Sequence, residues 1–164
     1  MKNFKCLIKD ADINCDKRLT EIAFSAKRYW NYPEEYYDIW KNELTITEEY
    51  IKNNIVKTIG NSNIIKGFYS FCFNDLEKYI GEIFIEKGYW LDHMFIEKRY
   101  IGKGLGKMMF NDLINDIKNR GGECFNIFVD PFARGFYEKM GCIYIRESKS
   151  SIENRTIPVY KYEI

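Results

Sequence analysis

The segment from Arg99 to Gly122, RYIGKGLGKMMFNDLINDIKNRGG, places three glycines on alternate positions directly before a helical pattern. The apolar residues of that pattern recur at helical spacing, at Leu105, Met108, Met109, Leu113, Ile114 and Ile117. A glycine loop that opens a helix offers unpaired backbone N–H groups and the positive end of the helix dipole, and no Cβ atom keeps an anion away. The segment therefore predicts a site for an anion, with phosphate as the obvious ligand.

The charges around this loop differ from those of the whole chain. Between positions 97 and 107 there are four basic residues and one acidic residue, namely Lys98, Arg99, Lys103, Lys107 and Glu97. The chain as a whole has 25 Lys and Arg against 24 Asp and Glu, a net charge of +1. Such a balance gives no global field toward nucleic acid or anionic lipid, so we expect neither a nucleic acid nor a membrane as partner.

Two familiar phosphate loops do not match these residues. In the frame of G-x-x-x-x-G-K-[ST] that ends at Gly106 and Lys107, Ile101 stands at the first glycine and Met108 at the magnesium-binding hydroxyl. In the dinucleotide pattern G-x-G-x-x-G, the last glycine would fall on Lys107 or Met109. A metal–nucleotide site and a dinucleotide site are both disfavoured.

The rest of the chain alternates between helical and extended patterns without a repeat or a linker. We expect helices at 12–29, from Pro33, at 47–54, from Leu105 to the Gly121–Gly122 pair, and at 133–140. We expect strands at 4–8, 55–59, 63–73, 79–86, 89–96, 124–129, 142–147 and 157–164. Turn residues separate the middle strands, so these should be antiparallel neighbours, and Gly67 and Gly81 indicate bulges or close backbone contacts. The pattern is that of an α+β or α/β sheet domain.

Length and composition predict the number of domains, the state of the cysteines and the cellular location. With 164 residues, 1–164 is expected to be a single domain. The five cysteines are scattered and lack a C-x-x-C pair, so we expect reduced, mostly buried thiols, no disulfide framework and no metal site. No apolar run reaches the length needed to cross a bilayer or to form a signal peptide, which predicts a cytoplasmic protein.

Two stretches together resemble the GNAT superfamily of acyl-CoA-dependent N-acetyltransferases. WLDHMFIEKRYIGKGLGKMMFNDL (90–113) resembles the family's fourth strand, pyrophosphate loop and following helix, and VDPFARGFYEKMGC (129–142) resembles its next strand and helix. The order of the remaining helices and strands is also similar, so the likeness covers nearly the whole chain. It implies a mixed, mostly antiparallel twisted sheet of about seven strands flanked by helices.

The resemblance also implies acetyl-CoA as the cofactor and locates its contacts. They comprise the end of the fourth strand, the loop and helix start, and the later helix: Met94, Phe95, Ile96; Ile101, Gly102, Lys103, Gly104, Leu105, Gly106, Lys107; Phe132, Ala133, Phe136, Tyr137 and Lys139. Ile101 stands where the family usually has Gln or Arg, so Arg99 or Lys103 is expected to supply the charge. Phe132 stands where the family often has Asn.

Acetyl transfer from a thioester to an amine needs a neutral amine, a polarised carbonyl and a donor for the departing thiolate. Tyr137 matches the tyrosine that many family members use as the general acid. Its alternative role is to pack the short helix on the sheet. For the base, His93, Asp92 and Glu82 all remain candidates, and a chain of water molecules is a further one. His93 and Asp92 should point to opposite faces of their strand.

The region 31–50 corresponds by chain order to the part of the family that shapes the acceptor site. It holds six acidic residues and a cluster of aromatic ones, a combination that suits a cationic amine. Tyr32, Glu35, Tyr36 and Trp40 are the candidate substrate contacts. The same pattern also fits a solvated helix face over an aromatic core stripe.

These observations predict an N-acetyltransferase that moves an acetyl group from acetyl-CoA to a small cationic primary amine by direct transfer. A protein N-terminus or lysine as acceptor, and a non-catalytic acyl-CoA sensor of the same fold, remain alternatives. A nucleotide-binding domain is the third, and the failed motif frames argue against it. A homodimer through the final strand IPVYKYEI is left open.

Overall fold

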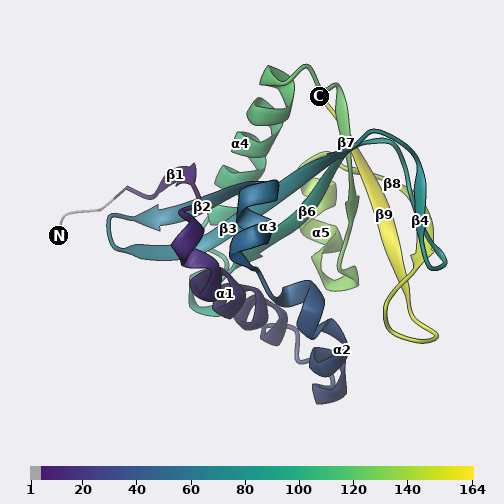
Figure 1. Cartoon of the computed structure of the whole chain (residues 1–164), viewed down its shortest axis with the longest axis horizontal. Coiled ribbons are helices and arrows are strands. Elements are labelled where there is room, and N and C mark those ends of the chain that lie inside the picture. The colour runs from purple at the N-terminus through teal and green to yellow at the C-terminus, as the bar shows by residue number, and fades with distance from the viewer. Residues whose placement is uncertain (1–4) are drawn as a thin grey trace. The chain divides into compact units, whose positions relative to one another are not determined.

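The computed structural model describes residues 5–164. Figure 1 labels its main helices and strands. In chain order the elements are β1 (Leu7–Asp10), η1 (Ile13–Cys15), α1 (Asp16–Arg28), α2 (Glu34–Leu44), α3 (Glu48–Asn53), β2 (Ile55–Asn61), β3 (Ile64–Asn74), β4 (Lys78–Ile80), β5 (Ile83–Ile85), β6 (Gly88–Ile96), η2 (Lys98–Tyr100), α4 (Leu105–Asn119), β7 (Cys124–Phe128), η3 (Pro131–Ala133), α5 (Arg134–Lys139), β8 (Ile143–Lys149) and β9 (Thr156–Glu163). No helix in this described range is long and apolar enough to cross a membrane.

Seven of the strands form one mixed sheet in the order β1-β2-β3-β6-β7-β9-β8. β6 pairs with β7 in parallel, with Tyr89 opposite Phe125, whereas β1–β2, β7–β9 and β8–β9 are antiparallel. A parallel pair needs a long crossover between its strands, and α4 lies within that crossover here. The predicted mixed, mostly antiparallel sheet of about seven strands flanked by helices is confirmed.

The residues fall into two compact units, one made of the residues up to Ser70 with His93–Asp112, and the other of Phe71–Asp92 with Leu113–Ile164. Each unit has its own buried apolar side chains. In the first unit these include Leu19, Ile22, Ile46, Ile59 and Phe68, and in the second Phe71, Leu113, Phe125, Val159 and Tyr160. That 1–164 is a single domain stays a prediction.

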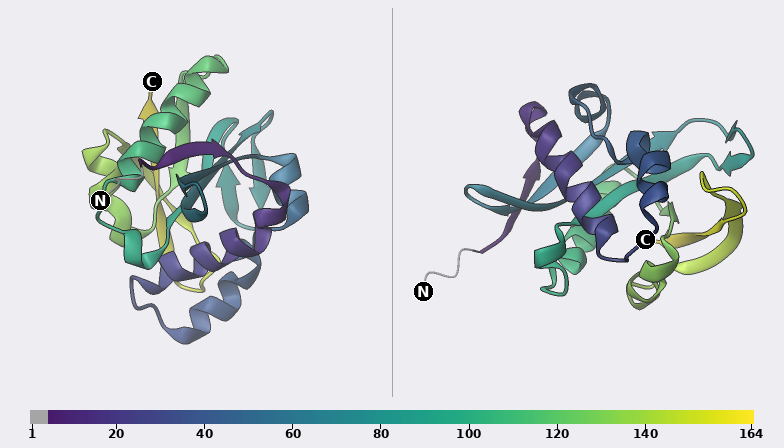
Figure 2. Two further views of the ribbon diagram at one scale, coloured as in Figure 1. Left: turned by 90° about the vertical axis from the view of Figure 1, so that its left-hand side faces the viewer. Right: turned by 90° about the horizontal axis from the view of Figure 1, so that it is seen from below.

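Two helices of the first unit, η1 and α3, begin at a side-chain cap. Asp12 accepts a hydrogen bond from the Asn14 N–H and starts η1, after which α1 runs from Asp16. Thr47 accepts from the Tyr50 N–H at 3.0 Å and starts α3, as its position predicted. The left view of Figure 2 shows α1 and α2 side by side.

One predicted strand is wrong. The run 79–86 was expected to be a single strand with Gly81 at a bulge or a close backbone contact, but it forms two short antiparallel strands, β4 and β5, in a separate two-stranded sheet. Ile80 pairs with Ile83, so Gly81 and Glu82 form a two-residue hairpin loop. Gly81 has a φ of 59°, a conformation that glycine adopts without strain and that turns the chain back at this point.

The structure also corrects the expected edge of the sheet. β9, which contains the sequence IPVYKYE, lies between β7 and β8, and its Val159 and Tyr160 are buried. The edge strand at this end of the sheet is β8, where Ile143, Tyr144 and Ile145 are exposed, and β1 is the edge strand at the other end. The cysteines are free, but Cys142 alone is buried and the other four are half-buried, so the expectation of mostly buried thiols is wrong.

The prediction of a close backbone contact at Gly67 is confirmed. A Cβ atom built on Gly67 in β3 would lie 2.7 Å from the carbonyl oxygen of Phe95 in β6. Because that oxygen belongs to the backbone of a strand, it cannot move aside like the end of a flexible side chain. Gly67 is therefore required for β3 and the end of β6 to lie at their observed separation.

We expect Gly67→Ala to lower the free energy of unfolding by about 1–3 kcal/mol, because the added methyl group overpacks the contact with Phe95. Gly135→Ala is the matched control, since a Cβ at Gly135 in α5 meets nothing within 4 Å. The control should be neutral or stabilising by about 0.5–1 kcal/mol. Urea unfolding of both variants measures the difference, and equal effects would contradict this account of Gly67.

Candidate functional site

The glycine loop has a left-handed backbone at two of its three glycines. Gly102 and Gly104 have φ values of 80° and 82°, and Cβ atoms at these positions would meet nothing within 4 Å. Both glycines are exposed. The left-handed backbone explains why glycine is required at these positions, and the open space means that the loop is not filled by neighbouring side chains.

α4 starts directly after this loop and is anchored by its apolar side. Leu105 is 6% exposed, and Met109 and Phe110 are fully buried. The first N–H groups of an α-helix lack intrahelical partners, so the start of α4 offers backbone donors beside the two glycines. Lys98, Arg99, Lys103 and Lys107 are exposed around the same segment. Open backbone donors together with cationic side chains fit the phosphate groups of coenzyme A.

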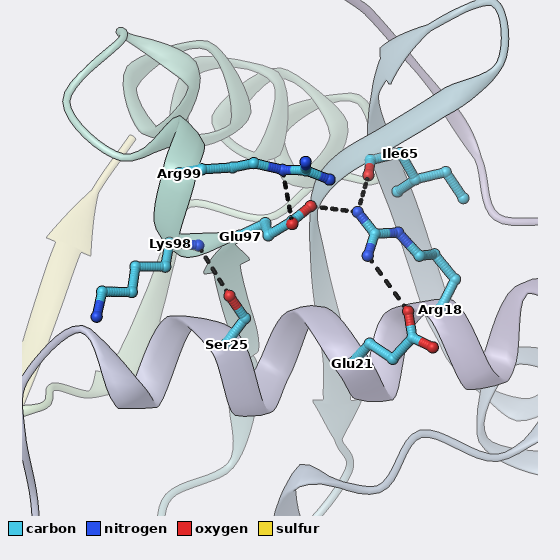
Figure 3. A network of polar contacts seen from close by, with 7 residues as sticks. All are labelled: Arg18, Glu21, Ser25, Ile65, Glu97, Lys98 and Arg99. Carbon is cyan, nitrogen blue, oxygen red and sulfur yellow. Dashed lines mark hydrogen bonds and ion pairs between the residues drawn. The ribbon is translucent and has the colours of Figure 1, made fainter.

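The segment that leads into the loop is held by an ion-pair network around Glu97 (Figure 3). Arg18 on α1 donates from Nη2 to Glu97 Oε2 and to the carbonyl oxygen of Ile65 on β3, the latter at 2.7 Å. Arg99 Nε lies 2.8 Å from Glu97 Oε1. The side chain of Glu97 is 15% exposed, so this carboxylate is largely removed from water and is paired with two guanidinium groups.

Backbone groups reinforce this network. The Lys98 N–H donates to Ser25 Oγ on α1 at 3.0 Å, also visible in Figure 3, and the Glu97 N–H donates to the Lys66 carbonyl oxygen at 2.9 Å. Glu97 is therefore attached to both α1 and β3, and the next residue, Lys98, is attached to α1. These attachments fix the end of β6 and the start of η2, from which the glycine loop continues.

Three cations surround the ring of Tyr100, the last residue of η2. Arg99 Cζ, Lys66 Nζ and Lys103 Nζ lie 5.0, 5.1 and 5.5 Å from its centroid. The aromatic face makes such a gathering of like charges less costly through cation–π contact. The two residues expected to supply charge in place of Ile101, Arg99 and Lys103, thus both lie against Tyr100.

His93 lies in a hydrogen-bonded cluster with two hydroxyl groups. Its Nδ1 is 2.9 Å from Ser70 Oγ and 3.1 Å from Tyr50 Oη, and the two hydroxyl oxygens are 2.8 Å apart. Its Nε2 is 3.2 Å from the carbonyl oxygen of Glu43. Each nitrogen of the imidazole thus has a polar partner within hydrogen-bonding distance.

Tyr137 lies on α5 in the second unit and is 8% exposed. Burial raises the pKa of its phenol above the usual range, with smaller contributions from Cys142 and Asp130. The phenol is therefore protonated at neutral pH and able to donate. Its ring packs edge to face against the ring of Phe136, with 5.1 Å between the two ring centroids. This packing also fits the structural role considered above, and the catalytic role stays a prediction.

The other proposed cofactor contacts are placed as follows. Met94, Phe95 and Ile96 are half-buried at the end of β6, following the residues Tyr89–Leu91 that pair with β7. Phe132, at the family's Asn position, is 57% exposed on η3. Ala133 is half-buried and Lys139 is exposed.

The two remaining base candidates are both exposed. Glu82 lies in the β4–β5 turn, where its Oε2 is 2.6 Å from Lys149 Nζ. Asp92 is exposed on β6, whereas His93 is half-buried, as expected for strand neighbours that point to opposite faces. Burial, with a further contribution from the Asp92 carboxylate, raises the pKa of the Cys72 thiol to about 11.

The candidate substrate contacts form an aromatic cluster at the start of α2. Tyr32, Tyr36 and Trp40 lie with their ring centroids 5.0–5.9 Å apart. Trp40 is 3% exposed, and Lys27 Nζ lies 4.7 Å from its centroid. One cation of the chain itself therefore already contacts this ring. Glu35 is exposed.

Sequence reasoning missed four residues that the fold brings to these places: Arg18, Glu97, Tyr50 and Ser70. Ser70 carried a signal, because a serine within the run FYSFCF must find a polar partner if it is buried, and it is fully buried here. Arg18 and Glu97 are 79 positions apart, and no local pattern links them.

A family model described as the acetyltransferase (GNAT) domain matches residues 41–164, more than half of the chain. The chain belongs to the GNAT acetyltransferase family. This confirms the resemblance drawn from residues 90–113 and 129–142. As a GNAT protein it is an acyl-CoA-dependent N-acetyltransferase whose acetyl donor is acetyl-CoA. No curated protein sequence matches the chain significantly.

Solved GNAT structures share the fold at low sequence identity. A GCN5-related N-acetyltransferase from Rhodopseudomonas palustris is 14% identical with a TM-score of 0.74, and covers 96% of this chain and 95% of its own. The PaiA N-acetyltransferase from Thermoplasma acidophilum in complex with coenzyme A is 16% identical with a TM-score of 0.73, over 98% and 99% of the two chains. The ribosomal-protein-S18-alanine N-acetyltransferase from Escherichia coli is 12% identical with a TM-score of 0.62, over 96% and 91%.

We expect Glu97→Gln to lower the free energy of unfolding by about 1–2 kcal/mol, because it leaves two guanidinium groups without their shared carboxylate. Glu21→Gln is the matched control. It removes the other carboxylate that pairs with Arg18, and its side chain is 68% exposed. An exposed ion pair contributes little, so the control should stay within about 0.5 kcal/mol of the parent protein. Thermal and urea unfolding check the pair, and equal losses would contradict the bracing role of Glu97.

Proposed function

We propose that this GNAT protein transfers the acetyl group of acetyl-CoA directly to a small cationic primary amine. The single observation that carries the proposal is the glycine loop, with its two left-handed glycines, open backbone and surrounding cations. A loop of this kind is suited to a pyrophosphate and to little else in a chain with a net charge of +1.

In the proposed binding mode, the backbone amides from Ile101 to Lys107 hold the pyrophosphate. Arg99 and Lys103 supply the charge that Ile101 lacks. This assignment is supported by their common position around Tyr100 and by the tether from Glu97 to Arg99 Nε. Met94, Phe95 and Ile96 are proposed to bind the pantetheine arm through their backbone groups, with Phe132, Ala133, Phe136 and Lys139 as further contacts.

In the proposed reaction, the amine attacks the thioester carbonyl, the C–S bond breaks, and Tyr137 donates a proton to the departing thiolate. Burial raises the pKa of Tyr137, so the phenol holds its proton at neutral pH, as a general acid must, although the same rise makes it a weaker donor toward a thiolate. His93 is our proposed base, because its imidazole is held by three polar partners. Asp92 and Glu82 remain the alternatives.

A cationic acceptor is supported by the charges on α2 and α3. Glu34, Glu35, Asp38, Glu43, Glu48 and Glu49 are all exposed, and Glu34 pairs with Arg28. The other acidic side chains give this surface a negative potential that attracts an amine before it binds. Tyr32, Tyr36, Trp40 and Glu35 are the proposed contacts for the bound acceptor.

The alternative to this enzyme is an acyl-CoA sensor without turnover, and membership of the acetyltransferase family argues against it. One observation favours it, namely that Phe132 is exposed at a position where many family members have an amide side chain. The sensor binds acetyl-CoA without acetylating any amine, so it differs from the enzyme in turnover and not in affinity.

The proposal is tested by release of the free CoA thiol from acetyl-CoA with a panel of amines, alongside calorimetric titration of acetyl-CoA. The panel contains polyamines, aminoglycosides, amino acids, and peptides with a free N-terminus or lysine. We expect turnover with the small cationic amines. Tight acetyl-CoA binding without turnover would establish the sensor, and no binding would overturn the assignment of the glycine loop.

We expect Tyr137→Phe to reduce kcat by about 10²–10⁴-fold while the Kd of acetyl-CoA changes little, because only the transition state uses the lost proton. Tyr79→Phe is the control, since Tyr79 is 71% exposed on β4 in the same unit. An unchanged kcat in Tyr137→Phe would assign Tyr137 to packing.

A further inference from the structure

We propose that Tyr50 takes the proton from the acceptor amine and passes it to His93, with Ser70 completing the hydrogen-bonded relay. This inference rests on the proposed function and deepens it, because it assigns the route by which the amine is made neutral. The three side chains come from α3, β3 and β6, all within the first compact unit.

The carbonyl oxygen of Glu43 fixes the tautomer of His93. A carbonyl oxygen only accepts, so the contact of 3.2 Å between it and Nε2 requires the proton on Nε2. In the neutral imidazole Nδ1 then carries the lone pair and accepts a hydrogen bond. Two hydroxyl groups lie within hydrogen-bonding distance of Nδ1, Ser70 Oγ at 2.9 Å and Tyr50 Oη at 3.1 Å.

The position of Glu43 explains why its carbonyl oxygen is available. Glu43 lies in the last turn of α2, which ends at Leu44, and the last four carbonyl groups of a helix lack intrahelical partners. Thr45 Oγ1 satisfies the Lys41 carbonyl oxygen at 2.6 Å, and His93 satisfies that of Glu43. A helix C-terminus also favours positive charge within its last turn, which is where the relay delivers the proton.

Burial decides which of the two hydroxyl groups meets the substrate. Ser70 is fully buried, whereas Tyr50 is half-buried at the surface helix α3, which also carries the exposed Glu48 and Glu49. The rings of Phe68 and Phe95 lie 6.0 and 5.8 Å from the imidazole. These apolar rings line the imidazole, so the hydroxyl groups are its polar contacts at Nδ1. Tyr50 is therefore the member of the relay placed to touch the amine.

The proton transfer balances as follows. An N–H bond of the acceptor ammonium or of the attacking amine breaks, and its proton goes to Tyr50 Oη while the Tyr50 O–H proton moves to His93 Nδ1. The second movement is direct or passes through Ser70, whose Oγ is 2.8 Å from Tyr50 Oη. The products are a neutral amine or amide, an unchanged phenol and an imidazolium with N–H donors toward both the hydroxyl groups and Glu43. No oxidant or further reactant is needed.

The first test compares two diamines of similar size, propane-1,3-diamine and its 2,2-difluoro analogue, whose amines are weaker bases. A weaker base is more often neutral on arrival and depends less on the relay. We expect Tyr50→Phe to reduce kcat at least about tenfold with the parent diamine and clearly less with the fluorinated one, at unchanged Kd for acetyl-CoA. Tyr29→Phe, at an exposed tyrosine after α1, should resemble the parent protein.

An equal loss with both diamines would overturn the relay, because a merely structural role of Tyr50 is indifferent to the basicity of the acceptor. Failure of the parent protein to acetylate either diamine would exclude both as acceptors, and nitrogen NMR of His93 then decides the relay. Ser70→Ala should give a smaller loss than Tyr50→Phe, because the 3.1 Å contact between Tyr50 and His93 remains. A larger loss in Ser70→Ala would also count against Tyr50 as the first acceptor.

The second test needs no turnover and therefore separates failure of the relay from failure of the proposed function. His93 is the only histidine in the chain, so nitrogen NMR of the untagged protein reports a single imidazole. We expect the proton on Nε2 and a hydrogen-bonded Nδ1 in the neutral form. We expect the Nδ1 resonance to shift in Tyr50→Phe and in Ser70→Ala but not in Tyr29→Phe. A proton on Nδ1 in the neutral imidazole, or an Nδ1 that neither variant affects, would overturn the relay.

Discussion

The Glu97 carboxylate is the contact on which the position of the glycine loop most depends. It is largely buried and is shared by Arg18 from α1 and Arg99 from η2, while the neighbouring backbone is attached to α1 and β3. A buried charge of this kind is tolerated only when its partners are held in place, so the ion pair and the packing of α1 support each other. The loop itself is rich in glycine, the residue with the greatest backbone freedom. This network fixes the point from which the loop starts.

A second group of polar contacts organises the proposed acceptor side of the first unit. Ser70 would be costly in the middle of an apolar strand without its hydrogen bonds, and the imidazole of His93 meets its hydroxyl there. The carbonyl oxygen of Glu43 at the end of α2 engages the other nitrogen. A helix end, a strand interior and a short helix are thus joined at one side chain, which links the stability of this region to its proposed chemistry.

Local features of the chain were read correctly because their physical causes are local. The alternate glycines predicted a loop before a helix, the spacing from Leu105 predicted α4, and Thr47 predicted the start of α3. The hairpin at Gly81 was missed because an isolated glycine in an apolar run is compatible with a bulge or a turn. Pairing of Ile80 with Ile83 decides between them, and that pairing forms only in the folded chain.

The sequence by itself determined the class of fold, the glycine loop that opens α4 and the family, because glycine conformation, helical spacing and local charge act over a few residues. Tertiary structure decided which strand forms the edge of the sheet, which carboxylate braces the loop and which hydroxyl groups meet the single histidine. Arg18 and Glu97, or Tyr50 and His93, are separated by 79 and 43 positions. Contacts at that separation depend on strand order and helix packing, which follow from burial of the whole core and not from any short pattern.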